Sequence, residues 1–240
     1  MIGTLAGITL RGLLNRRRTL WLALLGVLLV GVSVLYRLAD QRGDEAVAFT
    51  AQLLANFGVA VLLPLVAVIV GTAALGSEIE DGTIIYLLAR PVARSLIVAA
   101  KLIVCWLVVA AMVAIPIVVA GLVAGPTRLG LAYAVASIAG ALEYTTVFIA
   151  LSLITSRALV IGLAYVIVWE GVVGSLFAGT RPFSVRQHVL AIAERLGGDG
   201  AVGAELELAV AIAMAGAVTA LGTLLAVRRL QRVELRGETA

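Results

Sequence analysis

Residues 102–124 read LIVCWLVVAAMVAIPIVVAGLVA, a run without a charged side chain. A bilayer core about 30 Å thick is crossed by about 20 apolar residues of α-helix, because each residue rises about 1.5 Å. The run is therefore long enough to span a membrane as a helix. It contains Cys105, the only cysteine of the chain, which excludes an internal disulfide and a cysteine-based metal site.

Five more apolar runs of similar length lie on either side of this one, and the fourth and fifth runs are separated by only two residues. The six predicted spans are about Thr19–Tyr36, Leu53–Gly76, Leu102–Ala124, Leu131–Thr155, Ala158–Gly179 and Leu206–Val227. We predict an all-α, polytopic integral membrane protein with six transmembrane helices in a single domain, residues 1–240.

The composition supports lipid as the surrounding solvent. Of the 240 residues, 62% are hydrophobic and 13% are charged, whereas a soluble domain is about 45–50% apolar and about 25% charged. A soluble domain of this size would lack the polar side chains needed to cover its surface. The net charge of +4 does not indicate nucleic acid binding, because membrane proteins collect basic residues on one side.

The positions of the basic residues predict the orientation. Of the 18 Lys and Arg residues, 12 lie at the termini and in the loops that share their side. Cytoplasmic loops hold the excess of basic residues, so both termini are expected to be cytoplasmic, in a plasma membrane. The 12 residues are Arg11, Arg16, Arg17, Arg18, Arg90, Arg94, Lys101, Arg157, Arg228, Arg229, Arg232 and Arg236.

Three segments outside the spans have helical patterning. Residues 1–18 are expected to form an elbow helix in the membrane interface. Residues 180–205, an outer loop, contain a second amphipathic helix, which Ser184 caps and which should rest on or dip into the outer leaflet. Residues 77–94 contain a third, cytoplasmic helix that begins at Ser77, where Ser77 and Glu80 form a capping pattern, and stops before Pro91.

The sequence offers little support for an enzyme. A nucleotide-binding P-loop needs a lysine after glycine, but the only lysine, Lys101, follows Ala100. The only histidine, His188, is expected to lie alone in the outer loop, where it cannot complete a hydrolytic triad or a metalloprotease site.

Residues 76–94 read GSEIEDGTIIYLLARPVAR and are followed by Lys101. This stretch resembles the G-x-E-x-x-x-G-T segment of ABC transporter permeases of the type-2 exporter class, and the six-span layout agrees with it. The resemblance implies an exporter of two such chains with two separate ATP-binding subunits, which hold the ATP and Mg²⁺. It also implies that the segment is the coupling element docked on those subunits, through Glu78, Ile79, Glu80, Asp81, Gly82, Thr83, Tyr86, Leu87, Arg90, Pro91 and Arg94.

The apolar side chains of this short helix support docking, because a protein groove would bury them where bulk lipid is absent. The other interpretation is a helix that lies on the inner leaflet, although its acidic residues disfavour an anionic surface. Two other functions stay open: a membrane anchor or assembly factor that binds a partner without transport, and a membrane-integral transferase. Lipids, drugs, peptides, polysaccharides and ions are all possible substrates.

A looser motif begins at Trp169-Glu170 and continues through the residues Arg181, Ser184, Arg186 and Gln187. It resembles the W-E stretch of permeases involved in multi-copper enzyme maturation. The sequence has no cluster of His, Cys or Met suited to carrying copper.

Two carboxylates, Glu143 and Glu170, fall inside predicted spans. A charge at the bilayer centre costs at least about 2.5–3.5 kcal/mol, so each should face the bundle interior with a partner or a task. The candidate residues of a translocation path or gate are Glu170, Trp169, Glu143 and Tyr144. The alternatives are a protonated Glu170 bonded to Tyr144 or Tyr165, and simple packing of a polar patch around Glu143.

Overall fold

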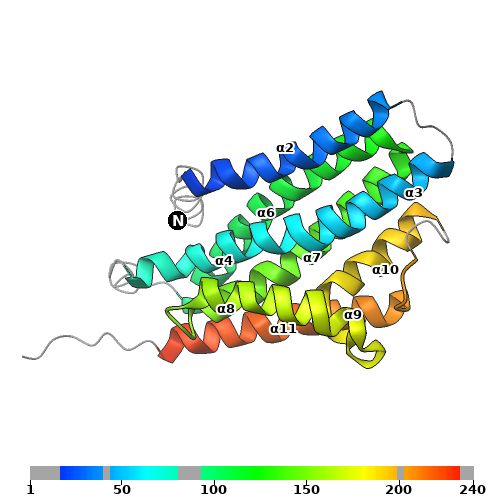
Figure 1. Cartoon of the computed structure of the whole chain (residues 1–240). Coiled ribbons are helices and arrows are strands. Elements are labelled where there is room, and N and C mark those ends of the chain that lie inside the picture. The colour runs from blue at the N-terminus through cyan, green and yellow to red at the C-terminus, as the bar shows by residue number, and fades with distance from the viewer. Residues whose placement is uncertain (1–16, 40–43, 81–92, 199–202, 233–240) are drawn as a thin grey trace, which may run out of the picture.

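The computed structural model describes residues 17–39, 44–80, 93–198 and 203–232. In these ranges the chain is helical apart from turns and short connections and contains no strand, which confirms the all-α prediction. The predicted elbow helix lies outside the described residues except for its last two positions. The helices form one elongated bundle in which neighbours in sequence run mostly antiparallel (Figure 1).

Several predicted spans correspond to composite helices. The first predicted span is a single helix, α2 (Arg17–Leu38). The second is composite and joins α3 (Asp44–Leu53), the π-helical η1 (Leu54–Leu62) and α4 (Leu63–Glu80). The remaining helices are α6 (Arg94–Ala124), α7 (Thr127–Ser152), α8 (Ala158–Ala164), the π-helical η2 (Tyr165–Val173), α9 (Gly174–Leu176), the 3₁₀-helical η3 (Ala178–Phe183), α10 (Val185–Gly197) and α11 (Leu208–Arg232).

Five helices in the described residues are long and apolar enough to cross a membrane: Trp21–Leu38, Glu45–Gly76, Arg94–Ala124, Thr127–Ser152 and Leu208–Arg232. The fifth predicted span corresponds to the shorter apolar helix Ala158–Val173, which continues into α9. The chain is thus a multi-pass membrane protein.

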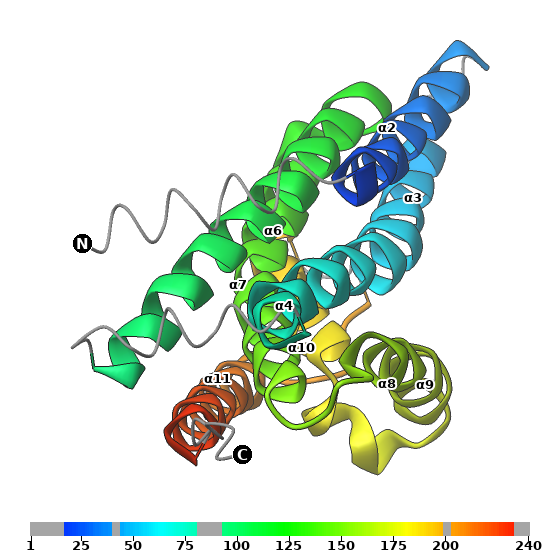
Figure 2. The ribbon, with the colours of Figure 1, turned by 90° about the vertical axis from the view of Figure 1, so that its left-hand side faces the viewer.

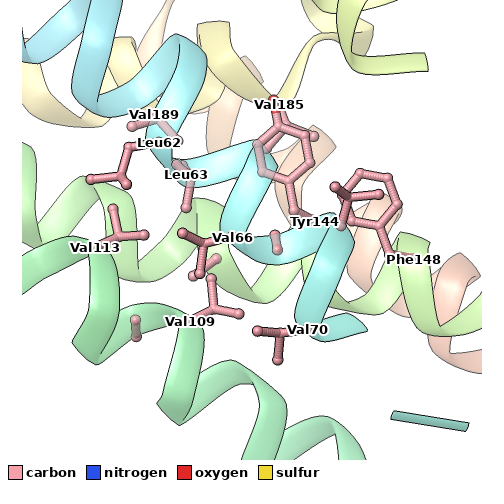
Figure 3. Packing of buried hydrophobic residues seen from close by; sticks show 14 of the residues in the cluster. Leu62, Leu63, Val66, Val70, Val109, Val113, Tyr144, Phe148, Val185 and Val189 are labelled. Carbon is pink, nitrogen blue, oxygen red and sulfur yellow. The ribbon is translucent and has the colours of Figure 1, made fainter. Parts of the chain in front are cut away.

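Helix α7 is the centre of the bundle. It packs against α6, α4, α10 and α11, which surround it when the bundle is viewed end-on (Figure 2). Two aromatic side chains of α7, Tyr144 and Phe148, are fully buried and stack with their ring centroids 5.8 Å apart. Valine and leucine side chains of α4, α6 and α10 fill the space beside them (Figure 3).

Two glycines let α6 and α7 cross in close contact. A Cβ atom added to Gly121 would lie 2.4 Å from the Cα atom of Gly130, which is far inside van der Waals contact. Small residues allow helix backbones to approach in this way inside membranes. A tight turn at Gly125 and Pro126 connects the two helices.

Helix α4 corrects one prediction. We expected a separate helix to begin at Ser77, but α4 continues without a break through Gly76 to Glu80. Ser77 and Glu80 therefore occupy a last helical turn rather than a first one, and Ser77 is not a cap. The prediction of a helix start at Ser77 was wrong because a helix that is already formed propagates at little cost through residues that would otherwise start a new one.

Helix α10 bears on a second prediction, that of the amphipathic helix in residues 180–205. Ser184 does cap it, accepting a hydrogen bond from the backbone N–H of Gln187 at 3.4 Å, as the sequence predicted. The helix does not lie on the outside of the molecule, however. Val185, Val189 and Ala193 are buried, and α10 packs between α7 and α11.

Candidate functional sites in the bundle

At one end of the bundle, which we call the Lys101 end, the single lysine of the chain is buried. Lys101 lies on α6 with 4% of its surface exposed. Its ammonium group donates to the carbonyl oxygen of Ala74 and to Oε1 of Glu78 on α4, both at 2.6 Å. A buried ammonium needs such partners to offset its lost hydration. The last turn of α4 is thereby fastened to α6.

Arg94, at the start of α6, makes a second contact at the Lys101 end. Its guanidinium donates to the carbonyl oxygens of Leu230, at 2.9 Å, and Gln231, in the last turn of α11. The last carbonyl groups of a helix generally lack partners within it, and a cation is favourable at the negative end of a helix dipole. Arg94 therefore caps α11 and joins it to α6.

Near the middle of the bundle, at a place that we call the His188 site, a histidine and a carboxylate meet in the interior. Glu143 of α7 is 1% exposed and His188 of α10 is fully buried. Nδ1 of His188 lies 2.7 Å from Oε2 of Glu143, and Nε2 lies 2.9 Å from the carbonyl oxygen of Pro182. The expectation that His188 stands alone in an outer loop is therefore wrong, because α10 folds back into the bundle.

The environment of His188 acts on its pKa in two directions. Burial disfavours the charged imidazolium and lowers the pKa, while the hydrogen bond and the negative charge of Glu143 and the carbonyl of Pro182 raise it. The second group of effects is larger, so the pKa of His188 lies above its ordinary value.

Glu170, on η2, holds the start of α10. Its Oε1 accepts from the backbone N–H of Val185 at 2.9 Å, and its Oε2 accepts from the hydroxyl of Ser184 at 2.5 Å. The backbone N–H of Arg186 lies 3.4 Å from Oε2. The first N–H groups of a helix lack internal partners and carry partial positive charge, so a carboxylate is favourable there.

The scan of known protein families supplies the family. A model described as "ABC-2 family transporter protein" matches residues 14–180, well over half of the chain. The chain belongs to this ABC-2 family. It is thus a membrane subunit of an ABC transporter, a permease, as the sequence predicted. No curated protein matches the chain in a direct search.

The family match is to ABC-2 transporters in general, so the branch associated with multi-copper enzymes stays a prediction. Within the described parts of the chain, no group of three or more His, Cys, Asp or Glu side chains could hold a metal ion.

The predicted coupling residues fall largely outside the described part of this ABC-2 permease. Glu78 and Arg94, which border the segment, are described and make the contacts given above. Ile79 and Glu80 belong to the last turn of α4, but their side chains are not described. The others lie in residues 81–92, outside the described ranges: Asp81, Gly82, Thr83, Tyr86, Leu87, Arg90 and Pro91.

The predicted path or gate residues lie together around the His188 site. Glu170 also accepts a hydrogen bond from the hydroxyl of Tyr165 at 3.2 Å, one of the two partners weighed for it. Trp169 donates from its indole nitrogen to the carbonyl oxygen of Phe183 at 3.3 Å. Tyr144 is fully buried one residue after Glu143. The sequence analysis did not pair His188 with Glu143, which lies 45 residues away on another helix.

Proposed function

We propose that this ABC-2 permease belongs to an ATP-driven exporter and that residues 77–94 couple it to a separate ATP-binding subunit. The observation that carries the proposal is the placement of Glu78 and Arg94. They border the segment on either side, and each is tied to a helix other than its own. A force applied to the segment would therefore act on more than the two helices that it connects.

The coupling works through three helices. ATP binding closes the pair of ATP-binding subunits, and the docked segment follows them. Lys101 makes the ends of α4 and α6 move together, and Arg94 adds the end of α11. The bundle then exchanges between inward-open and outward-open states, as rigid elements do in domain motions of this kind.

The assembly contains two copies of this chain and two ATP-binding chains in the plasma membrane. Hydrolysis needs a pair of ATP-binding subunits, and one permease chain offers one coupling segment. Both termini and the Lys101 end face the cytoplasm, because the basic residues concentrate there. ATP and Mg²⁺ bind the partner subunits.

Co-purification from native membranes, followed by reconstitution into liposomes, tests the coupling. The ATP-binding subunit encoded beside this chain should co-purify with it, and Glu80→Ala or Gly82→Leu should detach it or abolish the stimulation of its ATPase. Glu205→Gln is the control, because Glu205 pairs with Arg181 at the far end of the bundle. ATP hydrolysis that is indifferent to changes at Glu80 and Gly82 would show that the coupling assignment is wrong.

The same liposomes separate a transporter from a membrane anchor. An anchor would bind the ATPase, yet ATP would leave the conformation of the permease unchanged. A transporter changes conformation with each ATP state, so a fluorophore placed near the His188 site should respond to ATP and to trapped hydrolysis products. An unchanged signal with bound ATPase would favour the anchor.

Glu170 belongs to the gate in this proposal. Glu170→Gln keeps the size of the side chain, but an amide has only one oxygen to accept the bonds that two carboxylate oxygens now accept. Transport should fall sharply while expression and basal ATPase activity stay unchanged. Normal transport by this variant would remove Glu170 from the mechanism.

A further inference from the structure

Glu143 and His188 form a pair whose protons can be counted from geometry alone. The partner of Nε2 is the carbonyl oxygen of Pro182, which can only accept, so Nε2 must carry a proton. Nδ1 and Oε2 of Glu143 are 2.7 Å apart, a distance that requires one proton between them. That proton resides on the imidazole or on the carboxyl group, and in either case the pair has no net charge.

The two neighbouring protonation states are both unfavourable. Without the shared proton, the lone pair of Nδ1 faces a carboxylate and the site carries a buried negative charge. With a second proton, the site carries a buried positive charge. Burying a net charge costs far more than burying a neutral, hydrogen-bonded pair, so the one-proton state should persist over a broad range of pH.

Among the described residues, the other ionisable groups near the pair make no hydrogen bond to Glu143 or His188. The nearest is Glu170 on η2, a second carboxylate, which is engaged by Ser184 and by the start of α10. Tyr144 on α7 and Tyr165 on η2 lie beside it. On α10, Arg186 donates instead to the side chain of Asn56 at 3.1 Å. On η3, Arg181 pairs with Glu205.

The pair adds a directional hydrogen bond to the apolar packing of α10 on α7. α10 approaches α7 so closely that a Cβ atom on Gly140 would lie 2.3 Å from Cγ2 of Val189. Glu143 and His188 bond α7 to the first turn of α10, whereas the last turn of α10 is bonded to α7 by Arg128, whose Nε donates to the carbonyl oxygen of Leu196 at 3.0 Å. Oε1 of Glu143, also buried, has no hydrogen-bond partner among the described residues, so the bond to His188 carries the whole polar compensation of this carboxyl group.

We propose that Glu143 and His188 form a buried site for a single proton, and that this proton latches α10 to α7. The inference goes beyond the proposed function and does not depend on an ATP-binding subunit. It concerns the state of one proton and the docking of one helix, and both can be measured on the purified chain.

Nitrogen-15 NMR of the imidazole tests the proton directly. His188 is the only histidine of the chain, so labelled histidine gives a single pair of ring signals that need no assignment, provided that the sample carries no histidine tag. The proposal expects a protonated Nε2 and a strongly hydrogen-bonded Nδ1 that do not titrate between about pH 5 and pH 8. A titration with the ordinary midpoint near about 6.5 would overturn the site.

Disulfide trapping tests the latch. A Cβ atom on Gly197 of α10 would lie 3.6 Å from Cβ of Ala132 on α7, within the range of about 3.5–4.5 Å that a disulfide needs. The trapping pair is therefore Ala132→Cys with Gly197→Cys, in a background with Cys105→Ala. The control pair is Gly76→Cys with Ser152→Cys, which joins α4 to α7 at the Lys101 end across 3.6 Å.

The measured quantity is the rate of oxidation of the trapping pair divided by that of the control pair, which cancels the effect of pH on thiol reactivity. Glu143→Ala or His188→Ala should lower this ratio at least about tenfold, because removing one partner of a buried pair is strongly destabilising. Glu143→Gln should lower it less, since an amide N–H can still donate to Nδ1. An unchanged ratio in the alanine variants, with the control pair still forming, would overturn the latch.

Discussion

At the residue scale, four acidic or basic side chains are buried in the described part of the bundle, Lys101, Glu143, Glu170 and His188, and each has a polar partner. Lys101 pairs with an acidic residue and a carbonyl group, and Glu170 binds the start of a helix. Glu143 and His188 satisfy each other. The general rule that a buried charge needs a partner holds at every one of these positions.

Replacing Lys101 by methionine should destabilise the Lys101 end. Methionine keeps the length of the side chain but leaves the carbonyl of Ala74 without its donor and removes the charge opposite Glu78. We expect a loss of about 1–3 kcal/mol, less than a fully buried pair would lose, because the side chain of Glu78 is 30% exposed. Thermal unfolding in detergent measures it.

The matching control is a double-mutant cycle with Glu78→Gln. The Glu78→Gln change should cost clearly less in the Lys101→Met background than in the wild type, with a coupling energy of about 0.5–3 kcal/mol. Additive losses would show that the two side chains do not stabilise each other.

The contribution of His188 to stability should decrease at alkaline pH. Its pKa is raised in the folded protein, so the stabilisation is fully present below the unfolded pKa of about 6.5 and is lost as the pH rises through the higher folded value. The reference is Glu143→Leu with His188→Leu, which has no titratable group at the site. The difference in melting temperature between wild type and reference should shrink above neutral pH; a difference that grew with pH would contradict this sign.

At the scale of elements, the sequence placed the apolar runs well and the helix ends poorly. Hydropathy predicts that a span begins at Leu102, but α6 begins at Arg94. Lys101 can lie within the helix because its ammonium group donates hydrogen bonds to Glu78 and to the carbonyl oxygen of Ala74. Ser184 was recognised as a cap because an N-cap depends only on neighbouring residues. The burial of α10 was missed because it depends on Glu143 and Gly140 of a distant helix.

The crossing of α6 and α7 should depend on Gly121. Gly121→Ala places a methyl group 2.4 Å from the Cα atom of Gly130, so the helices must separate, at a cost of about 1–3 kcal/mol. The control is Gly31→Ala on α2, where a Cβ atom meets nothing within 4 Å. There the substitution should stabilise the helix by about 0.5–1 kcal/mol. Thermal unfolding compares the two, and equal effects would show that the crossing tolerates a side chain.

At the scale of the whole molecule, the contacts of Lys101 and Arg94 connect the helices on either side of the proposed coupling segment, α4 and α6, to each other and to α11. Arg94→Ala should therefore lower transport more than it lowers ATP hydrolysis by the partner subunit, because α11 would no longer follow α6. Arg94→Lys should restore only part of the transport, since an ammonium cannot reproduce the forked geometry of a guanidinium that contacts two carbonyls. Parallel transport and ATPase measurements in liposomes decide this. Equal losses of both activities would place Arg94 in assembly rather than in transmission.

The sequence by itself determined the solvent, the fold class and the family of this protein. Runs such as residues 102–124 can be stable only in lipid, and residues 76–94 carry a local motif; both properties depend on residues that are close together in the chain. Only the tertiary structure decided that His188 meets Glu143 and that Lys101 meets Glu78, because these pairs join separate helices. A charged residue in an apolar run predicts that a partner is present, but only the packing of the helices determines which residue that partner is.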